Sequence, residues 1–227
     1  MNLWAMVPAA GRGMRLGGIR KALILIRDKP MVFHACLPLA RHPDLKGIVV
    51  AASSEDVEEV KKQLAALPGN KVHAVVRGGE TRQESVAAAL EAIPDKEGVV
   101  LVHDGARPVL RRSLVDRIVQ APWEGASGVI PIVSIHDTVR YVSEGKVVRS
   151  LDRRGLSAVQ TPQKFPLELL RRLWSEQKNA GVTDDAQLLE SEGLALKTVA
   201  GDPANLKVTT EEDLALVRAL LSANLEP

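Results

Sequence analysis

Residues 3–13 read Leu-Trp-Ala-Met-Val-Pro-Ala-Ala-Gly-Arg-Gly, an apolar run that passes directly into a glycine-containing turn. A near-continuous apolar run of this length predicts a strand over Leu3–Pro8 that is covered on both faces of its sheet. In a parallel α/β sheet, ligands bind just beyond the carboxyl ends of the strands. Glycines at that edge let backbone N–H groups approach phosphate oxygens, so the stretch predicts a phosphate-binding turn.

Similar apolar runs alternate with segments of helical periodicity along the rest of the chain. Further strands are predicted over residues 47–52, 72–76, 99–103, 127–133 and 195–200, and helices over 31–41, 56–66, 82–92, 113–120, 166–178, 185–192 and 210–222. Thr81 and Glu84 form a capping-box pattern at the start of one helix. This alternation predicts an α/β fold with a mostly parallel central sheet and helices on both faces.

The segment from Thr138 to Leu151 breaks this alternation. Two strand-like runs flank Ser-Glu-Gly-Lys at positions 143–146, which is a turn signal, so the segment predicts an inserted β-hairpin arm within residues 134–156. An isolated two-stranded hairpin is marginally stable in water and needs a surface to pack against. That surface could be the body of its own chain or a partner subunit, and the sequence leaves both alternatives open.

The bulk composition excludes several classes of protein. The chain has 227 residues, 45% of them hydrophobic and 26% charged, with a net charge of +2, so we expect one globular domain over residues 1–227. The absence of a long basic block gives no case for nucleic acid. No apolar run approaches the roughly 20 residues that cross a bilayer, and no secretory signal is expected. With Cys36 as its one cysteine, a buried small residue, the chain fits a cytoplasmic enzyme that binds no membrane.

Cations are concentrated in the segment that follows the first glycines. Arg12, Arg15, Arg20 and Lys21 all lie there. The Walker pattern of phosphate-binding loops is absent, and Leu16 occupies the position of the third glycine in the dinucleotide pattern. Several cations suit a triphosphate that is being cleaved, whereas a dinucleotide needs little more than a helix N-terminus. A solvated basic loop is the alternative.

An acid and a base follow the predicted strand over residues 99–103. Asp104 lies where an oxygen ligand for Mg2+ would be useful, because Mg2+ often takes only one or two carboxylates from the protein. Arg107 could hold a phosphate through paired hydrogen bonds. The alternative is a plain salt bridge between the two. His103 is interpreted as structural, since the histidines of the chain show no zinc-ligand spacing.

Six motifs occur in an order that resembles one enzyme family. They are Pro8-Ala9-Ala10-Gly11-x-Gly13-x-Arg15, Gly78-Gly79-x-x-Arg82-x-x-Ser85-Val86, His103-Asp104-Gly105-Ala106-Arg107-Pro108, Thr161-Pro162-Gln163-x-Phe165, Thr183-Asp184-Asp185-Ala186 and Asn205-Leu206-Lys207-Val208-Thr209. Together they resemble the 2-C-methyl-D-erythritol 4-phosphate cytidylyltransferases of the non-mevalonate isoprenoid pathway. The resemblance runs from about residue 3 to residue 220 and implies a Rossmann-like nucleotidyltransferase fold.

The resemblance also implies a role for each matched residue. Those that would bind the nucleotide are Ala9, Ala10, Gly11, Gly13, Gly79, Glu80, Ser85 and Ala106. Those that would act as catalytic cations are Arg15, Lys21 and Lys207. Those that would bind the second substrate are Asp104, Arg107, Thr138, Arg153 and Thr183, with Asp104 also near Mg2+ or another divalent cation. Family members are homodimers in which Thr138 and Arg153 of the arm would enter the partner's pocket.

The chain departs from the family pattern at two positions. Many members have proline before the catalytic lysine, where this chain has Arg20, and the first loop is about one residue shorter. Arg20 could therefore compete with Lys21 for the catalytic role. Glu80 stands where aspartate is common.

The reaction implied by the resemblance is an in-line displacement on CTP. A phosphate oxygen of the sugar-alcohol phosphate attacks the α-phosphorus, and pyrophosphate leaves. Repulsion between the two anions is the main obstacle, so catalysis is mostly positioning and charge stabilisation, and no general base is required. The alternatives are a CTP-dependent enzyme acting on ribitol 5-phosphate, a purine-dependent sugar nucleotidyltransferase, and a non-catalytic nucleotide-binding protein.

Overall fold

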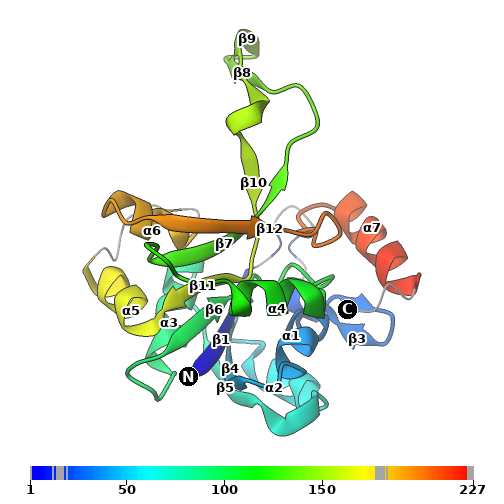
Figure 1. The fold of residues 1–227 in the computed structure, drawn as a ribbon. Helices are drawn as coiled ribbons and strands as arrows, with labels where there is room; N and C mark the ends of the chain where they lie inside the picture. The colour runs from blue at the N-terminus through cyan, green and yellow to red at the C-terminus, as the bar shows by residue number, and fades with distance from the viewer. Residues whose placement is uncertain are drawn as a thin grey trace.

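An eight-stranded sheet forms the centre of the molecule in the computed structural model, which describes residues 2–11, 13, 18, 20–176, 182 and 184–223 (Figure 1). Its strands are β1 (Leu3–Pro8), β4 (Leu45–Ala52), β5 (Val72–Arg77), β6 (Val99–Val102), β7 (Gly128–Ser134), β10 (Ser157–Val159), β11 (Gln163–Pro166) and β12 (Leu196–Ala200). They lie in the order β10-β7-β11-β6-β1-β4-β5, and β12 pairs with β7.

The strands of this sheet run mostly in one direction. Strands β4 and β6 flank β1 in parallel, β5 extends the sheet beyond β4, and β12 is parallel to β7. Strand β11 lies antiparallel between β6 and β7, and β10 is antiparallel to β7. The predicted mostly parallel α/β sheet is confirmed. The sequence did not predict β10 and β11, because residues 157–166 contain two prolines and a lysine.

Seven α-helices surround the sheet within the described ranges. They are α1 (Met31–Ala40), α2 (Val57–Leu64), α3 (Arg82–Glu91), α4 (Arg112–Gln120), α5 (Leu167–Glu176), α6 (Ala186–Ser191) and α7 (Glu211–Ser222). The predicted capping box is present on α3: the Thr81 hydroxyl accepts from the Glu84 N–H at 3.1 Å, and the Glu84 carboxylate accepts from the Thr81 N–H at 3.0 Å. Thr210 and Asp213 form the same arrangement on α7.

Several shorter elements connect the larger ones. They are the 3-10 helices η2 (Lys21–Leu23), η3 (Pro68–Asn70) and η4 (Arg153–Gly155), and the small antiparallel pair β2 (Leu25–Ile26) and β3 (Lys29–Pro30). None of them was predicted from the sequence, because each is too short to show a periodic pattern.

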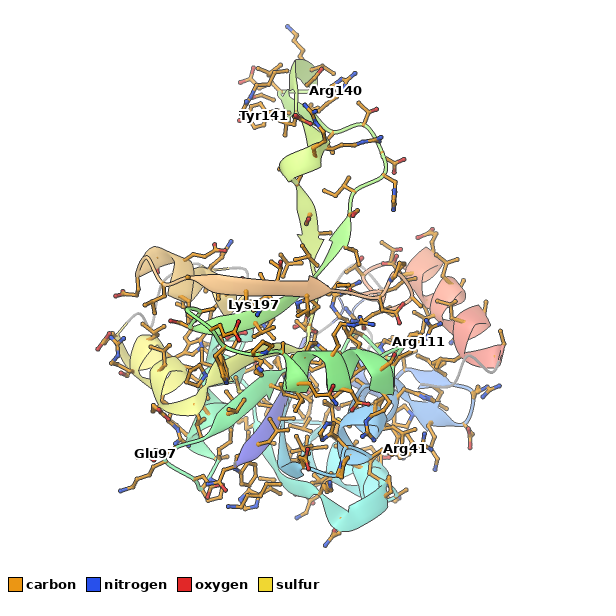
Figure 2. The ribbon with its side chains drawn as sticks, viewed as in Figure 1. Arg41, Glu97, Arg111, Arg140, Tyr141 and Lys197 are labelled. Atoms are coloured by element: carbon orange, nitrogen blue, oxygen red, sulfur yellow. The ribbon has the colours of Figure 1, made fainter. Side chains whose placement is uncertain are left out.

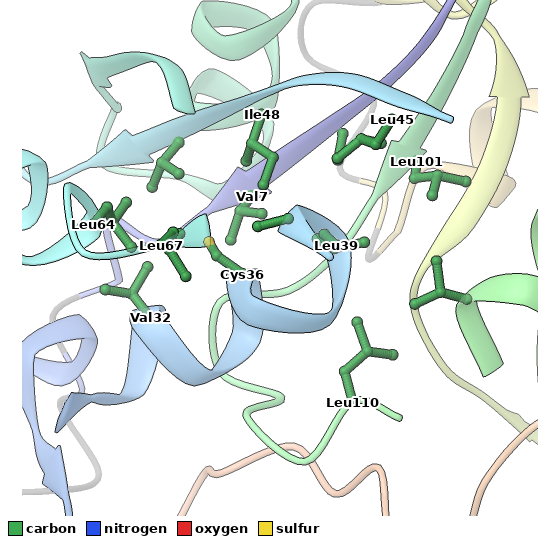
Figure 3. Close-up of a cluster of buried hydrophobic side chains, with 14 of the residues drawn as sticks. Val7, Val32, Cys36, Leu39, Leu45, Ile48, Leu64, Leu67, Leu101 and Leu110 are labelled. Atoms are coloured by element: carbon green, nitrogen blue, oxygen red, sulfur yellow. The ribbon is translucent and has the colours of Figure 1, made fainter. Parts of the chain in front are cut away.

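Apolar side chains of β1 alternate between the two faces of the sheet. Leu3, Ala5 and Val7 pack with α1, α2 and α4 in the cluster of Figure 3, whereas Trp4 and Met6 pack with α3, α5 and α6 on the other face. Fully burying one such Val or Leu contributes about 1.5–3 kcal/mol relative to exposing it. Both faces are therefore covered, as the apolar run predicts.

Cys36 confirms its prediction as a small buried residue. Its side chain lies inside the cluster of Figure 3, and burial raises the pKa of the thiol to about 12. In the part of the chain that the structure describes, no helix combines the length and apolarity that crossing a bilayer requires.

The predicted hairpin is present as a projecting arm. It consists of β8 (Arg140–Ser143) and β9 (Lys146–Ser150), which pair only with each other and extend away from the body (Figures 1 and 2). All residues of both strands are exposed, including Tyr141 and Val147, the latter at 64%. The arm therefore does not lie on the body of its own chain, which was one of the two open alternatives.

Candidate active site

A cleft of about 170 Å³ opens at the carboxyl ends of β1 and β6 and beside the start of α3. Ten of the residues singled out from the sequence line it: Ala9, Ala10, Gly11, Lys21, Gly79, Glu80, Ser85, Asp104, Ala106 and Lys207. A second hollow of about 340 Å³ shares Ala10, Gly79 and Glu80 with the first and continues past Ser53 and Arg77. The sheet edge thus brings together segments that are up to two hundred residues apart in the chain.

Small residues allow the loops of the cleft to pack closely. A Cβ added to Gly78 would lie 2.7 Å from both the Ala10 Cβ and the Ser85 Oγ, and one added to Gly105 would lie 2.9 Å from the Ala9 Cβ. These distances are shorter than real Cβ contacts, so glycine fits at these two positions where a larger residue would clash with its neighbours.

The hydroxyl group of Ser85 holds the turn between β5 and α3. It donates a hydrogen bond to the Thr81 carbonyl at 3.0 Å and accepts one from the Gly79 N–H at 3.2 Å. Ser85 is itself buried, and both bonds are partly buried. The Gly79–Ser85 segment is thereby fixed as one wall of the cleft.

Asp104 is the charged centre of the cleft. Its carboxylate contacts Arg82 Nε at 3.2 Å and Lys207 Nζ at 2.8 Å. Burial opposes ionisation of this group, but the positive charges of Arg82 and Lys207 outweigh burial and hold the pKa of Asp104 well below its usual value. The carboxylate is therefore negatively charged at neutral pH and aligned between two cations from distant segments.

The backbone around Asp104 is fixed by a short chain of hydrogen bonds. The Asp104 N–H donates to Thr161 Oγ1 at 3.0 Å, and Thr161 Oγ1 lies 3.1 Å from His103 Nδ1. His103 Nε2 lies 3.1 Å from the Arg107 carbonyl. Burial lowers the pKa of His103 to about 4, so the ring is neutral, donates from Nε2 and accepts at Nδ1. This arrangement agrees with the interpretation of His103 as structural.

Arg82 is a site residue to which the sequence assigned no role. Its guanidinium lies 2.7 Å from the fully buried Asp185 carboxylate, which also accepts from Trp174 Nε1 at 3.1 Å. Burial disfavours the charge of Arg82, but Asp185 and Asp104 outweigh it and raise the pKa of the guanidinium. Arg82 belongs to the Gly78–Val86 motif and Asp185 to the Thr183–Ala186 motif. The presence of an unassigned cation in one motif and an unassigned carboxylate in another could have suggested this pair.

Arg20 and Lys21 lie in different environments. Lys21 lines the cleft at the start of η2. Arg20 is not one of the described residues that line the cleft. Its guanidinium instead pairs with Asp56 at the start of α2. The sequence left open whether Arg20 competes with Lys21 for the catalytic role. Of the two, Lys21 is the cation that lines the cleft.

Four other predicted residues that the structure describes do not line the cleft. Arg107 donates to the Asn205 carbonyl at 2.8 Å and lies 3.8 Å from Asp104. Gly13 lies in the first loop at a φ of 55°, a backbone conformation that favours glycine. Thr138 and Arg153 are exposed on the arm and its stem, where Arg153 donates to the His136 carbonyl. Arg15 and Thr183 lie outside the described residues.

The ligands that the cleft offers to a metal ion are few. Asp104 is the carboxylate that the cations surround, and the described ranges contain no cluster of three or more His, Cys, Asp or Glu side chains. Such a donor set does not suit a metal held entirely by protein. It fits Mg2+, which takes most of its ligands from phosphate oxygens and water.

The fold and this cleft together define a nucleotidyltransferase: a glycine-lined edge of a parallel sheet at which cations surround one carboxylate. Sequence and structure comparisons then place the chain in a particular family. The family model for 2-C-methyl-D-erythritol 4-phosphate cytidylyltransferase matches residues 3–223, and the chain belongs to this family of isoprenoid biosynthesis.

Individual relatives agree with this assignment. A 2-C-methyl-D-erythritol 4-phosphate cytidylyltransferase of Streptomyces coelicolor is 42% identical over 96% of this chain and 84% of its own length. A bifunctional enzyme IspD/IspF of Solidesulfovibrio magneticus is 40% identical over 95% of this chain, which spans 56% of that relative. A crystal structure of 4-diphosphocytidyl-2C-methyl-D-erythritol synthase superimposes with a TM-score of 0.81 at 31% identity, over 97% of this chain and 98% of the other.

Proposed function

We propose that this chain transfers the cytidylyl group of CTP to 2-C-methyl-D-erythritol 4-phosphate and releases pyrophosphate. The observation that carries the proposal is the convergence of Lys21, Arg82 and Lys207 with Asp104 at one glycine-lined cleft. Two polyanions repel each other, so a site that joins them needs fixed positive charge where their phosphates meet. A non-catalytic nucleotide-binding protein would have no use for this arrangement.

The chemical step is an in-line attack of the acceptor phosphate on the α-phosphorus of CTP. The attacking oxygen is already ionised, the new P–O bond forms as the bond to pyrophosphate breaks, and no general base is needed. Lys21 lies where it can neutralise charge that develops on the α-phosphate and the leaving group. Arg15, which lies outside the described residues, is assigned a similar role by its motif.

Lys207 can contact a phosphate without leaving Asp104. Its ammonium group has three N–H donors, of which one is directed to the Asp104 carboxylate at 2.8 Å, and its side chain is 42% exposed. The remaining donors are available to a phosphate that enters the cleft. When Mg2+ is bound, it would shield the phosphate charges beside Asp104, which is the residue that would hold it.

The nucleoside of CTP would bind along the two tightly packed loops. The backbone of Ala9, Ala10 and Gly11 forms the floor near the phosphates. The turn that Ser85 fixes, with Gly79 and Glu80, offers a rigid surface for a small pyrimidine base. Close packing at Gly78 leaves this wall little freedom to move back for a purine.

The arm supports the proposal of a homodimer. Tyr141, Val142 and Val147 are large apolar side chains of the arm that the same chain leaves exposed. In a symmetric pair, the same surface on each copy would pack against the other. Thr138 and Arg153, at the base of the arm, would then contribute to the partner's pocket and bind the phosphate of the acceptor. A cytoplasmic location fits the lone, buried Cys36.

Release of pyrophosphate tests the proposed function. Purified protein would be incubated with CTP and Mg2+, and separately with 2-C-methyl-D-erythritol 4-phosphate, with ribitol 5-phosphate, or with no acceptor. We expect rapid release only with the methylerythritol phosphate, and little when GTP replaces CTP. Preferential release with ribitol 5-phosphate would reassign the acceptor, and no release with any acceptor would refute the enzyme proposal.

A further inference from the structure

Arg20 stands immediately before Lys21, at the position where the family resemblance leads us to expect proline. Its side chain is 55% exposed, yet the guanidinium does not extend freely into solvent. Both Nε and Nη2 of Arg20 contact the same oxygen, Oδ1 of Asp56. An ion pair therefore replaces a residue whose usual property is backbone rigidity.

Asp56 is a fixed anchor for this pair. Its side chain is 6% exposed, and its other oxygen, Oδ2, accepts from Ser53 Oγ at 2.6 Å. The Asp56 N–H donates to the Ser53 carbonyl at 2.9 Å, and the Asp56 carbonyl accepts from the Val60 N–H at 2.8 Å as α2 begins. The carboxylate is thus tied to the end of β4 and the first turn of α2, both parts of the packed body.

The backbone of Arg20 already has the conformation that proline would impose. Its φ is −60°, and a proline ring fixes φ near −65°. The η2 turn follows at once: the Leu23 N–H donates to the Arg20 carbonyl at 2.9 Å, and Ala22 is buried. Lys21 is the first residue of that turn and lines the cleft.

We propose that the Arg20–Asp56 ion pair positions Lys21, by fixing the start of η2 in the way that a proline ring would. Arg20 is then a positioning residue and not a second catalytic cation. Its charge is matched by the Asp56 carboxylate, which does not line the cleft, whereas Lys21 does. The inference rests on the role proposed above for Lys21.

Alanine and proline at position 20 make a matched pair of variants. Both remove the guanidinium and leave Asp56 buried without this cation, a change that destabilises the fold to a similar extent in either variant. They differ in that Arg20→Pro retains a fixed φ, whereas Arg20→Ala releases it. A difference in turnover between them therefore reports the backbone restraint and not the lost charge.

The test measures kcat and the KM for CTP in the full-length Arg20→Ala, Arg20→Pro, Asp56→Ala and Lys21→Ala variants, with thermal unfolding as a stability control. We expect Arg20→Ala and Asp56→Ala to lower kcat by about tenfold with little change in KM, less than the roughly hundredfold that a misplacement of 1 Å can cost. We expect Arg20→Pro to recover most of the lost turnover. Lys21→Ala should abolish nearly all activity.

Three results would overturn the proposal. Unchanged kcat in Arg20→Ala would show that the ion pair positions nothing. Arg20→Pro as slow as Arg20→Ala, or Asp56→Ala as fast as the unmodified protein, would show that the charge of Arg20 is what matters. If Lys21→Ala is also active, the role proposed for Lys21 fails together with this one, whereas an inactive Lys21→Ala beside a fully active Arg20→Ala refutes the positioning role alone.

Discussion

The cleft and the arm of this molecule are built on opposite principles. In the cleft, Gly78 and Gly105 are packed so closely by their neighbours that a Cβ would not fit, and each charge of the Arg82–Asp104–Lys207 group has a partner from a distant segment. In the arm, every strand residue is exposed, and an ion pair of its stem, Arg154 with Asp152, joins near neighbours in the chain. The cleft is therefore fixed by its own chain, whereas the role proposed for the arm requires a second chain.

The largest expected effect contrasts a carboxylate of the cleft with one of the arm stem. Asp104→Asn removes the negative charge between Arg82 and Lys207, so we expect kcat to fall by at least about a hundredfold, or roughly 3 kcal/mol of transition-state stabilisation. Asp152→Asn, whose partner Arg154 is largely exposed, should leave kcat unchanged. Steady-state kinetics with CTP in excess would measure both, and turnover of Asp104→Asn within threefold of the unmodified protein would contradict the account.

A pair of glycine substitutions makes the next contrast. Gly78→Ala places a methyl group 2.7 Å from Ala10 and Ser85, so we expect a loss of about 2 kcal/mol in the free energy of unfolding and weaker binding of CTP. Gly155→Ala, in the stem of the arm, meets no atom within 4 Å and should be close to neutral. Urea unfolding and calorimetric titration with CTP would check both. Equal effects of the two substitutions would show that the cleft is not closely packed.

The smallest expected effect distinguishes the two arginines of the arm stem. Arg153→Ala should raise the KM for 2-C-methyl-D-erythritol 4-phosphate by about tenfold, close to 1.4 kcal/mol, and leave the KM for CTP unchanged. Arg154→Ala is the control, because that residue pairs with Asp152 and has no predicted role. A rise confined to the KM for CTP would show that Arg153 contributes to nucleotide binding and not to acceptor binding, which would contradict the prediction.

Much of the fold could be predicted because it depends on patterns that are local in the sequence. The alternating apolar runs placed β1 at its observed bounds, and Thr81 with Glu84 marked the start of α3. The antiparallel strand β11 was missed because Lys164 lies at its centre and reads as polar. The structure buries Lys164 and directs its ammonium group to the Ala121 carbonyl at 2.5 Å, a contact that no local pattern reveals.

The site residues that could be predicted from the sequence are glycines and single charged residues that directly follow a predicted strand or lie in the loop after it. Asp104 and Lys21 both face the cleft as expected. The pairing of Arg82 with Asp185 was not predictable, because the two residues are 103 positions apart and their meeting depends on how α3 and α6 pack. The same holds for Arg20, whose role depends on a partner at the start of a different helix.

The most direct test of the account asks whether the arm of one chain serves the cleft of another. Lys21→Ala chains have a damaged cleft and an intact arm, whereas Arg153→Ala chains have an intact cleft and a damaged arm. If they are mixed, dissociated and reassociated, half of the dimers are mixed and hold one complete site, so activity at low acceptor concentration should recover to about a quarter of that of the unmodified protein. Activity that stays at the average of the two separate variants would contradict the account.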